Sequence, residues 1–335
     1  MKGVLEGLSF WEKEAYKVFN KNLNRYRNLY RSSNFDQIKK EIAINVRSKD
    51  IKIQILNSLT LGDILEKQGS FIQAREHFHK AEKLIDELFD FDLQSLIKIQ
   101  IARNYVSLGK LDNGVKLLKE IKIKNIDLKK YAMNSLAYAY RVQGKNKEAE
   151  KIFNRLSDDW LKTEIDLSIA HNLAGLYREL ERYEESLNLY KKILNKTEQT
   201  NVFAIAKLYN NIGFIYRKLG KYSLAEKYYL KSYQMEKQIG SKQLQGRTLN
   251  NLGGIYRMRK RYKEALSYFS DSAYMRSRIG DNSGLSSSLL NKGIVLREMG
   301  EKKSAEKFLR ESYNIRKRTG SEKLINEVKV ELEKL

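Results

Sequence analysis

Cysteine and proline are both absent from this chain of 335 residues. Without cysteine there is no disulfide framework, no thiolate metal site and no thiol nucleophile, and this composition fits a reducing compartment. Without proline, and with abundant Lys, Leu, Glu, Ile and Ala, the composition favours helix. These absences lead us to expect a helical protein of the cytoplasm.

Long apolar runs and catalytic groupings are missing as well. No segment approaches the about 20 apolar residues of a membrane-spanning helix, and the first 19 residues lack the apolar run of a signal peptide. His77 and His79 would diverge by about 200° on a helix, which disfavours a shared metal ion. The glycines of NLGGIY (251–256) fall inside an expected helix, not after a strand as in a phosphate-binding loop. We therefore expect no enzymatic activity, no cofactor, no bound metal and no membrane span.

Acidic residues are the minority charge. The formal net charge is +23, and residues 201–320 hold 25 Lys and Arg against 9 Asp and Glu. Such a surplus indicates an acidic partner, which can be a peptide, a nucleic acid or an anionic surface. A solubilising lysine-rich surface is the other explanation, and composition leaves both open.

One template recurs along the chain at intervals of 35 to 40 residues. The template is anchored on a small residue at Gly62, Ala102, Ala137, Ala174, Gly213, Gly253 and Gly293, which follows an apolar residue in every unit but the last, where Lys292 precedes Gly293. A large residue comes three positions later, a small one after twelve and a large one after sixteen, as Tyr216, Ala225 and Tyr229 follow Gly213. Between the two halves stands a turn glycine, replaced in two repeats by Glu181 and Lys260. The periodicity predicts seven units of two antiparallel helices, each stacked on its neighbours.

The order of small, aromatic, small and aromatic slots resembles the tetratricopeptide repeat (TPR) family over roughly residues 50–320. The unit length is similar to that of the long-repeat branch, which includes Pins-type adaptors, kinesin light chains and bacterial TPR regulators, although the family's usual proline is missing. The resemblance implies an all-α fold: a right-handed α-solenoid of antiparallel helix pairs, the TPR superhelix, with a concave groove that binds peptides. We expect N-terminal helices with a degenerate repeat over 1–50, seven repeats over 51–320 and a capping helix over 321–335.

Polar residues recur on a second face of the first helix of each unit. At 100° per residue, Asn210, Asn211 and Arg217 lie away from the packed stripe around Tyr216. An arginine row directly follows the large residue, at Arg141, Arg178, Arg217, Arg257 and Arg297. An asparagine row stands two residues before the small anchor, at Asn172, Asn211, Asn251 and Asn291. A partial third row, interrupted by His171 and Leu290, comprises Asn134, Asn210 and Asn250.

The chemistry of these rows suits an extended, acidic peptide of another protein. An Asn amide offers both a donor and an acceptor to a ligand backbone, and Arg offers a forked cation to carboxylates. Lys207, Lys218 and Arg247 complete the predicted peptide-binding set. Gly175 and Gly254 would leave open floor for a ligand backbone, and Tyr138, Phe214 and Met258 would form apolar pockets.

A purely structural explanation of the rows stays open. In that case the Asn side chains bridge neighbouring helices, and the Arg side chains pair with Glu179, Glu298 or an adjacent unit. The first units depart from the pattern, with Glu66 and Val106 in the Arg slot and Thr60 and Gln100 in the Asn slot. We expect these units to contribute less to an acidic ligand.

The sequence therefore predicts a non-enzymatic adaptor that captures an acidic peptide in a groove lined by Asn and Arg. A bacterial peptide-sensing regulator is a related alternative, although residues 1–50 show no clear helix-turn-helix. A binder of RNA or single-stranded DNA in the same basic groove is a third. Most Tyr occupy core slots, so few rings are free to stack on bases, and this disfavours a nucleic-acid ligand.

Overall fold

The structure, a computed structural model, describes residues 50–67, 70–156, 164–199, 201–319 and 322–335. The degenerate repeat expected near the N-terminus lies outside these ranges. Within them the chain forms fifteen α-helices and no β-strand. No helix in the described ranges is both long and apolar enough to cross a membrane. The helices are α5 (Ile51–Lys67), α6 (Phe71–Ile85), α7 (Phe91–Ser107), α8 (Leu111–Glu120), α9 (Ile126–Val142), α10 (Asn146–Arg155), α11 (Glu164–Glu179), α12 (Tyr183–Lys196), α13 (Val202–Lys218), α14 (Tyr222–Gln238), α15 (Lys242–Met258), α16 (Tyr262–Arg278), α17 (Asn282–Glu298), α18 (Lys302–Thr319) and α19 (Glu322–Glu333).

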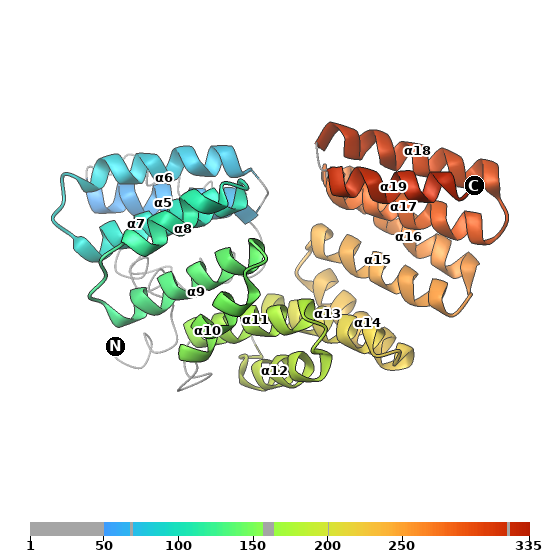
Figure 1. Ribbon diagram of the computed structural model, residues 1–335, viewed down its shortest axis with the longest axis horizontal. Coiled ribbons are helices and arrows are strands. Elements are labelled where there is room, and N and C mark those ends of the chain that lie inside the picture. Colours follow the sequence, from blue (N-terminus) through green and yellow to red (C-terminus); the bar gives the residue numbers. More distant parts are fainter. Residues whose placement is uncertain (1–49, 68–69, 157–163, 200, 320–321) are drawn as a thin grey trace. The chain divides into compact units, whose positions relative to one another are not determined.

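Consecutive helices pack as pairs, from α5 with α6 to α17 with α18 (Figure 1). The pairs belong to two compact units: the N-terminal unit ends at Lys196, and the C-terminal unit runs from Thr197 to Leu335. Inside each unit, one pair also contacts the next, for example α16 against α17. The all-α class and the division into helix pairs, both predicted from the sequence, are confirmed.

The small anchor of the template lies against the large residue sixteen positions later. A Cβ atom on Gly213 would lie 2.9 Å from the Tyr229 ring, and one on Gly253 would lie 2.7 Å from the Phe269 ring. Both rings are fully buried. A large side chain at the anchor would push the two helices apart, so the small slot, Gly or Ala, determines how closely each pair packs.

The turns inside the pairs from α7–α8 to α17–α18 need a left-handed backbone. Gly220 adopts φ +72°, and the amide of Lys221 donates to the Tyr216 carbonyl, which closes the first helix. Glu181 and Lys260, which replace this glycine in two repeats, both adopt φ +59° at the same place. The turn geometry is therefore kept where glycine is missing, although a left-handed residue with a Cβ atom costs about 1–2 kcal/mol.

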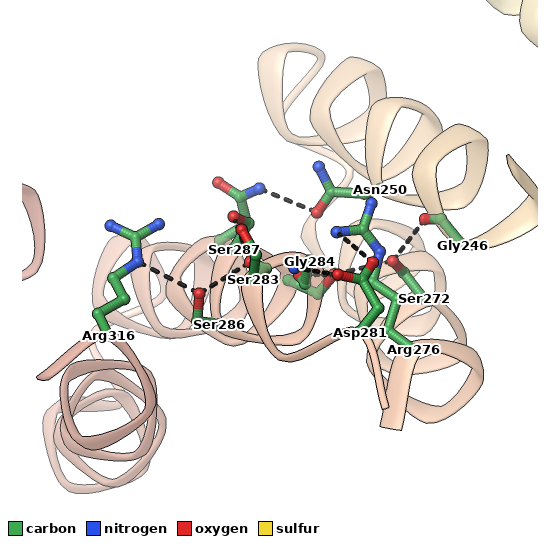
Figure 2. Close-up of polar contacts among 12 residues, drawn as sticks. Gly246, Asn250, Ser272, Arg276, Asp281, Ser283, Gly284, Ser286, Ser287 and Arg316 are labelled. Carbon is green, nitrogen blue, oxygen red and sulfur yellow. Dashed lines mark hydrogen bonds and ion pairs between the residues drawn. The ribbon is translucent and has the colours of Figure 1, made fainter. Parts of the chain in front are cut away.

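Buried serines tie the second helix of each pair to the first in the C-terminal unit. Their hydroxyls donate to first-helix carbonyls at 2.6–2.7 Å, a contact that Figure 2 shows for Ser272 and Gly246. The pairs are Ser232 with Ala206, Ser272 with Gly246, and Ser312 with Ser286. These serines are 40 residues apart, so the same hydrogen bond between the two helices recurs in three successive pairs.

The last helix, α19, covers the apolar face of the final pair. Val328 is fully buried and packs with Leu290 and Leu309. Arg316 of α18 donates to the Leu324 carbonyl at 2.7 Å and lies 2.6 Å from the Glu327 carboxylate. Helix α19 thus buries an apolar face of the α17–α18 pair.

Candidate functional site

The predicted peptide-binding residues all lie on the first helices of the pairs. They are Asn134 and Arg141 on α9, Asn172 and Arg178 on α11, Lys207, Asn210, Asn211, Arg217 and Lys218 on α13, Arg247, Asn250, Asn251 and Arg257 on α15, and Asn291 and Arg297 on α17. Inside each compact unit, the repeat places the members of a row at equivalent positions of successive first helices. The hydrogen bonds and ion pairs of each row show which of these side chains are already bound to another part of the protein.

The asparagine rows bridge neighbouring repeats. An Asn two residues before the anchor donates through Nδ2 to the Oδ1 atom of the Asn three residues before the anchor in the preceding repeat. The distances are 2.9 Å for Asn172 to Asn134, 3.3 Å for Asn251 to Asn210, and 3.0 Å for Asn291 to Asn250, the last shown in Figure 2. These side chains therefore hold the scaffold together, and the peptide contact predicted for them stays a prediction.

Asn211 is the exception in its row. Its side chain is half-buried and makes no hydrogen bond within the described part of the chain. The acceptor slot of the preceding repeat holds His171 in place of Asn, so the amide-to-amide pairing has no equivalent here. His171 instead packs edge-on against Tyr190, with ring centroids 5.4 Å apart. Within the C-terminal unit, described by itself, the Asn211 amide therefore has no hydrogen-bond partner.

Three arginines of the row form ion pairs between repeats. In two cases the acceptor is the Glu directly after the Arg of the next repeat, and in the third it is a Glu of α19. The distances are 3.4 Å for Arg141 to Glu179, 3.2 Å for Arg257 to Glu298, and 3.1 Å for Arg297 to Glu331. Arg178 lies 3.8 Å from the carboxylate of its own neighbour Glu179. The scaffold pairing considered in the sequence analysis is therefore present for most of the row.

Arg217 has no such carboxylate. The residue directly after the Arg of the next repeat is Met258, whose side chain is 51% exposed. Within the described residues Arg217 makes no ion pair; its Nε atom is buried without a hydrogen-bond partner, and its guanidinium lies 5.1 Å from the Phe214 ring centre. Of the five row arginines, this is the one without a carboxylate partner among the residues that the structure describes.

A second group of cations stands near the start of α13 and α15. Burial lowers the pKa of the Lys207 ammonium, and the nearby Arg247 guanidinium lowers it further. No hydrogen bond or ion pair to Lys207 is present among the described residues; its ammonium lies 5.3 Å from the Phe203 ring centre. The Arg247 guanidinium thus lies close enough to Lys207 to disfavour the charged form of the ammonium.

Buried charge from the second helices supports this region. Glu236 is fully buried and accepts hydrogen bonds from Ser232 and Thr248, each at 2.8 Å. Burial raises the pKa of Glu236, and Arg247 opposes the rise. One repeat later the same position holds the buried Arg276, 3.9 Å from Asp281 (Figure 2). Both charges belong to second helices, and the sequence reasoning did not predict them. Their spacing of 40 residues, one repeat, could have indicated that Glu236 and Arg276 occupy equivalent positions.

Of the two glycines expected to leave the helix backbone open to a ligand, only Gly254 does so. A Cβ atom on Gly254 would meet no atom within 4 Å, so the surface is free there. A Cβ atom on Gly175 would lie 2.7 Å from the Arg141 guanidinium, so Arg141 covers that glycine. The expectation for Gly175 was wrong because the arginine row folds across it.

The early repeats carry a different polar cluster, which sequence reasoning missed. Asp63 and Glu66 of α5 face Arg103 of α7, and Arg103 also contacts Gln100 and the Tyr131 hydroxyl. Burial raises the pKa of Asp63 to about 6, with Arg103 opposing the rise. Asp63 and Arg103 directly follow the small anchors of successive repeats, Gly62 and Ala102. This equivalent position could have predicted from the sequence that the two side chains lie close together. Two carboxylates face one guanidinium here, so Arg103 is already paired and is not a free cation for an acidic ligand.

The other unusual slots of the early repeats are also occupied. Thr60 is buried and donates to the Leu56 carbonyl at 2.8 Å, and Val106 is buried. Glu66 accepts a hydrogen bond from Asn104 at 2.9 Å. Within the described residues, no group of three or more His, Asp or Glu side chains gathers as metal ligands would.

A sequence profile described as tetratricopeptide repeat matches residues 131–199, 165–238, 204–273 and 244–318. Two curated relatives are the protein O-mannosyl-transferase TMTC2 of Mus musculus, 35% identical over 97 residues (27% of this chain, 11% of that protein), and that of Homo sapiens, 40% identical over 65 residues (19% and 8%). The chain spans about a tenth of the length of these relatives.

Solved structures share the fold. A signal transduction ATPase with a tetratricopeptide repeat sensor, from Pyrococcus horikoshii, is 16% identical with a TM-score of 0.64, over 87% of this chain and 51% of that one. The apo form of RapI is 14% identical with a TM-score of 0.58, over 82% and 80%. Aspartyl phosphate phosphatase F from Bacillus subtilis is 16% identical with a TM-score of 0.54, over 82% and 77%.

Proposed function

Because the chain belongs to the tetratricopeptide repeat family, we propose that it is a non-enzymatic cytoplasmic scaffold for another protein. Its ligand is an extended, acidic segment of that protein, bound along the first-helix face of the C-terminal unit. One observation carries the proposal. Lys207 and Arg217 lie on the same helix as Asn211, and within the described residues none of the three has the hydrogen bond or ion pair that occupies most of the other row residues.

The chemistry of these groups selects the class of ligand. Guanidinium and ammonium groups bind carboxylates through charge-assisted hydrogen bonds, each worth about 1.5–3 kcal/mol. An amide pairs with a peptide backbone whatever the ligand sequence. Two or three such contacts give micromolar binding when the ordering cost of the ligand is modest. The local surplus of 25 basic over 9 acidic residues in 201–320 adds long-range attraction.

A nucleic-acid ligand is less well supported. Single strands are held by aromatic rings that stack on bases. Tyr216 is 7% exposed, and Tyr256 is stacked on Tyr268 at 5.0 Å. These rings pack helices against one another, so the first-helix face offers charge and amide groups more than stacking platforms.

The proposal is tested by capture from extracts of the native host, with the full chain and a Lys207→Glu/Arg217→Glu variant as baits. Each protein retained by the wild type alone is then divided into overlapping synthetic peptides and titrated. We expect binding to concentrate in acidic, extended peptides of one partner. If no such peptide binds, or if nuclease treatment removes the captured material, the scaffold function proposed here is wrong.

A further inference from the structure

Helix α13 differs from the other first helices of the C-terminal unit. On α15 and α17, Asn251 and Asn291 donate to the preceding repeat. On the same two helices, Arg257 and Arg297 form ion pairs with carboxylates. On α13 the corresponding Asn211 and Arg217 do neither within the described residues. Within the C-terminal unit, α13 is therefore the first helix on which the residues of both rows lack a scaffold partner.

The released groups lie on one side of α13, within about 120° of one another around its axis. Lys207, Asn211, Phe214 and Lys218 follow the spacing i, i+4, i+7 and i+11, which aligns side chains along a helix, and Arg217 lies beside the last of them. At 1.5 Å per residue, the Cα atoms of Lys207 and Arg217 stand about 15 Å apart along the axis. The face therefore presents a cation at each end, with an amide and an aromatic ring between them.

The charges on this face call for an external anion. An uncompensated cation that is partly removed from water is costly unless a counter-charge pairs with it. For Arg217 the scaffold lacks the carboxylate that Glu298 supplies to Arg257. For Lys207 the described charge that affects its titration is another cation, Arg247. An acidic ligand would supply the missing charge at both ends.

Helix α15 adds an apolar border beside the α13 face. Gly254 leaves its surroundings empty to 4 Å, and Met258 is 51% exposed. A thioether is flexible and polarisable, so it adapts to different apolar ligand groups. An apolar ligand side chain between two acidic ones would meet Met258 and the Phe214 ring.

We propose that α13 is the recognition helix of this chain, and that it binds an extended segment with two acidic residues about four positions apart and an apolar residue between them. The spacing follows because an extended chain advances about 3.3–3.6 Å per residue, so about 15 Å corresponds to about four residues. The inference rests on the proposed function, because it names the subsite and sequence pattern of the same peptide ligand.

The experiment is selection of a display library of random segments of about 12 residues, which extend to about 40 Å, against the full chain. We expect acidic residues three to five positions apart, with an apolar residue between them, to be enriched. A selected peptide is then titrated against Lys207→Gln/Arg217→Gln and against Arg257→Gln, whose scaffold partner is Glu298. The first variant should lose about tenfold or more in affinity, and the second less than about threefold.

The outcomes distinguish a failure of the recognition role of α13 from a failure of the proposed peptide-binding function. Acidic peptides without a preferred spacing, or equal losses in both variants, would overturn the recognition role of α13 and leave a peptide-binding scaffold. If the library yields no acidic peptide that binds, the proposed function itself fails. Circular dichroism and the melting temperature of each variant show that a loss of affinity is not a loss of fold.

Discussion

The Nε atom of Arg257 lies 3.2 Å from the Oε1 atom of Glu298, and this pair defines what Arg217 lacks one repeat earlier. There the equivalent of Glu298 is Met258, so the guanidinium of Arg217 has no carboxylate in the described part of the scaffold. One side-chain difference between repeats thus separates an arginine used for internal stability from one that is available for binding.

Replacing Met258 with Glu should switch Arg217 from the ligand to the scaffold. The new carboxylate would take the place that Glu298 has beside Arg257, and an acidic peptide would lose a contact worth about 1.5–3 kcal/mol, or about tenfold or more in Kd. A half-exposed ion pair would raise the free energy of unfolding by at most about 1 kcal/mol. Peptide titration and urea denaturation measure the two effects.

The reciprocal change, Glu298→Met, is the matched control. It releases Arg257 and should keep or increase peptide affinity. A loss of affinity in Glu298→Met as large as that in Met258→Glu would contradict the difference drawn between the two arginines.

Neighbouring asparagines on α13 should differ in their effect on stability. Asn210 is buried, donates to Thr248 at 2.6 Å and accepts from Asn251, so Asn210→Ala should lower the free energy of unfolding by about 1–3 kcal/mol. Asn211 has no described partner, so Asn211→Ala should change stability by less than about 0.5 kcal/mol while it weakens peptide binding. Chemical denaturation of both variants is the measurement, and equal destabilisation would refute the assignment.

Lys260→Gly should stabilise the protein. Lys260 adopts φ +59°, which is strained for a residue with a Cβ atom, and glycine relieves that strain at some entropic cost, so we expect a gain of about 0.5–1 kcal/mol. Gly220→Ala is the opposite case. Gly220 has φ +72° and open space around it, so only the backbone conformation is affected, and a loss of about 1–2 kcal/mol is expected. Thermal melting that shows no gain for Lys260→Gly would argue against strain at this turn.

Asp63 should make stability depend on pH. Its pKa rises from 3.8 to about 6 on folding, so between these values the folded chain binds more protons than the unfolded chain. The free energy of unfolding contributed by this group is therefore highest below about pH 4 and falls as the pH rises to about 6, by about 1–3 kcal/mol. Asp63→Asn should lack this fall, while Glu66 remains beside Arg103.

The measurement is the urea midpoint of both proteins from about pH 4 to about pH 7, since these values span the titration of Asp63. The difference between the two curves isolates Asp63 from the other acidic groups. Parallel curves would mean that Asp63 titrates normally in the folded chain.

The helix pairs could be predicted because their cause is periodic. Gly213 and Tyr229 recur as small and large residues at fixed spacing, and only close helix packing requires that spacing in every repeat. The turns at Glu181 and Lys260 were also visible as departures from glycine, because the neighbouring repeats defined what the position needs. Backbone and packing requirements are the same in every repeat, so the same residue types recur in the sequence and predict the helix pairs and their turns.

The roles of the polar rows could not be read in the same way. A bridging Asn251 and an available Asn211 occupy equivalent positions, and the difference lies in the partner that the preceding repeat supplies. Arg217 and Arg257 likewise differ only through Met258 and Glu298. Asn210 stands three residues before its anchor and Asn251 two residues before the next one. That difference is consistent with a hydrogen bond between the two helices, but the distance between the helices is needed to recognise it.

The most direct test of α13 as the binding face is a titration of a selected acidic peptide at about 0.1 M and about 1 M salt, where the Debye length falls from about 10 Å to about 3 Å. Lys207→Gln/Arg217→Gln is compared with Lys227→Gln/Lys303→Gln, which removes the same charge from exposed sites on α14 and α18. We predict that the α13 variant loses about tenfold or more in affinity at the lower salt concentration, and that the surface variant stays within about threefold of the wild type. Equal losses in the two variants, both abolished at the higher salt concentration, would mean that the attraction is diffuse and would contradict a recognition site on α13.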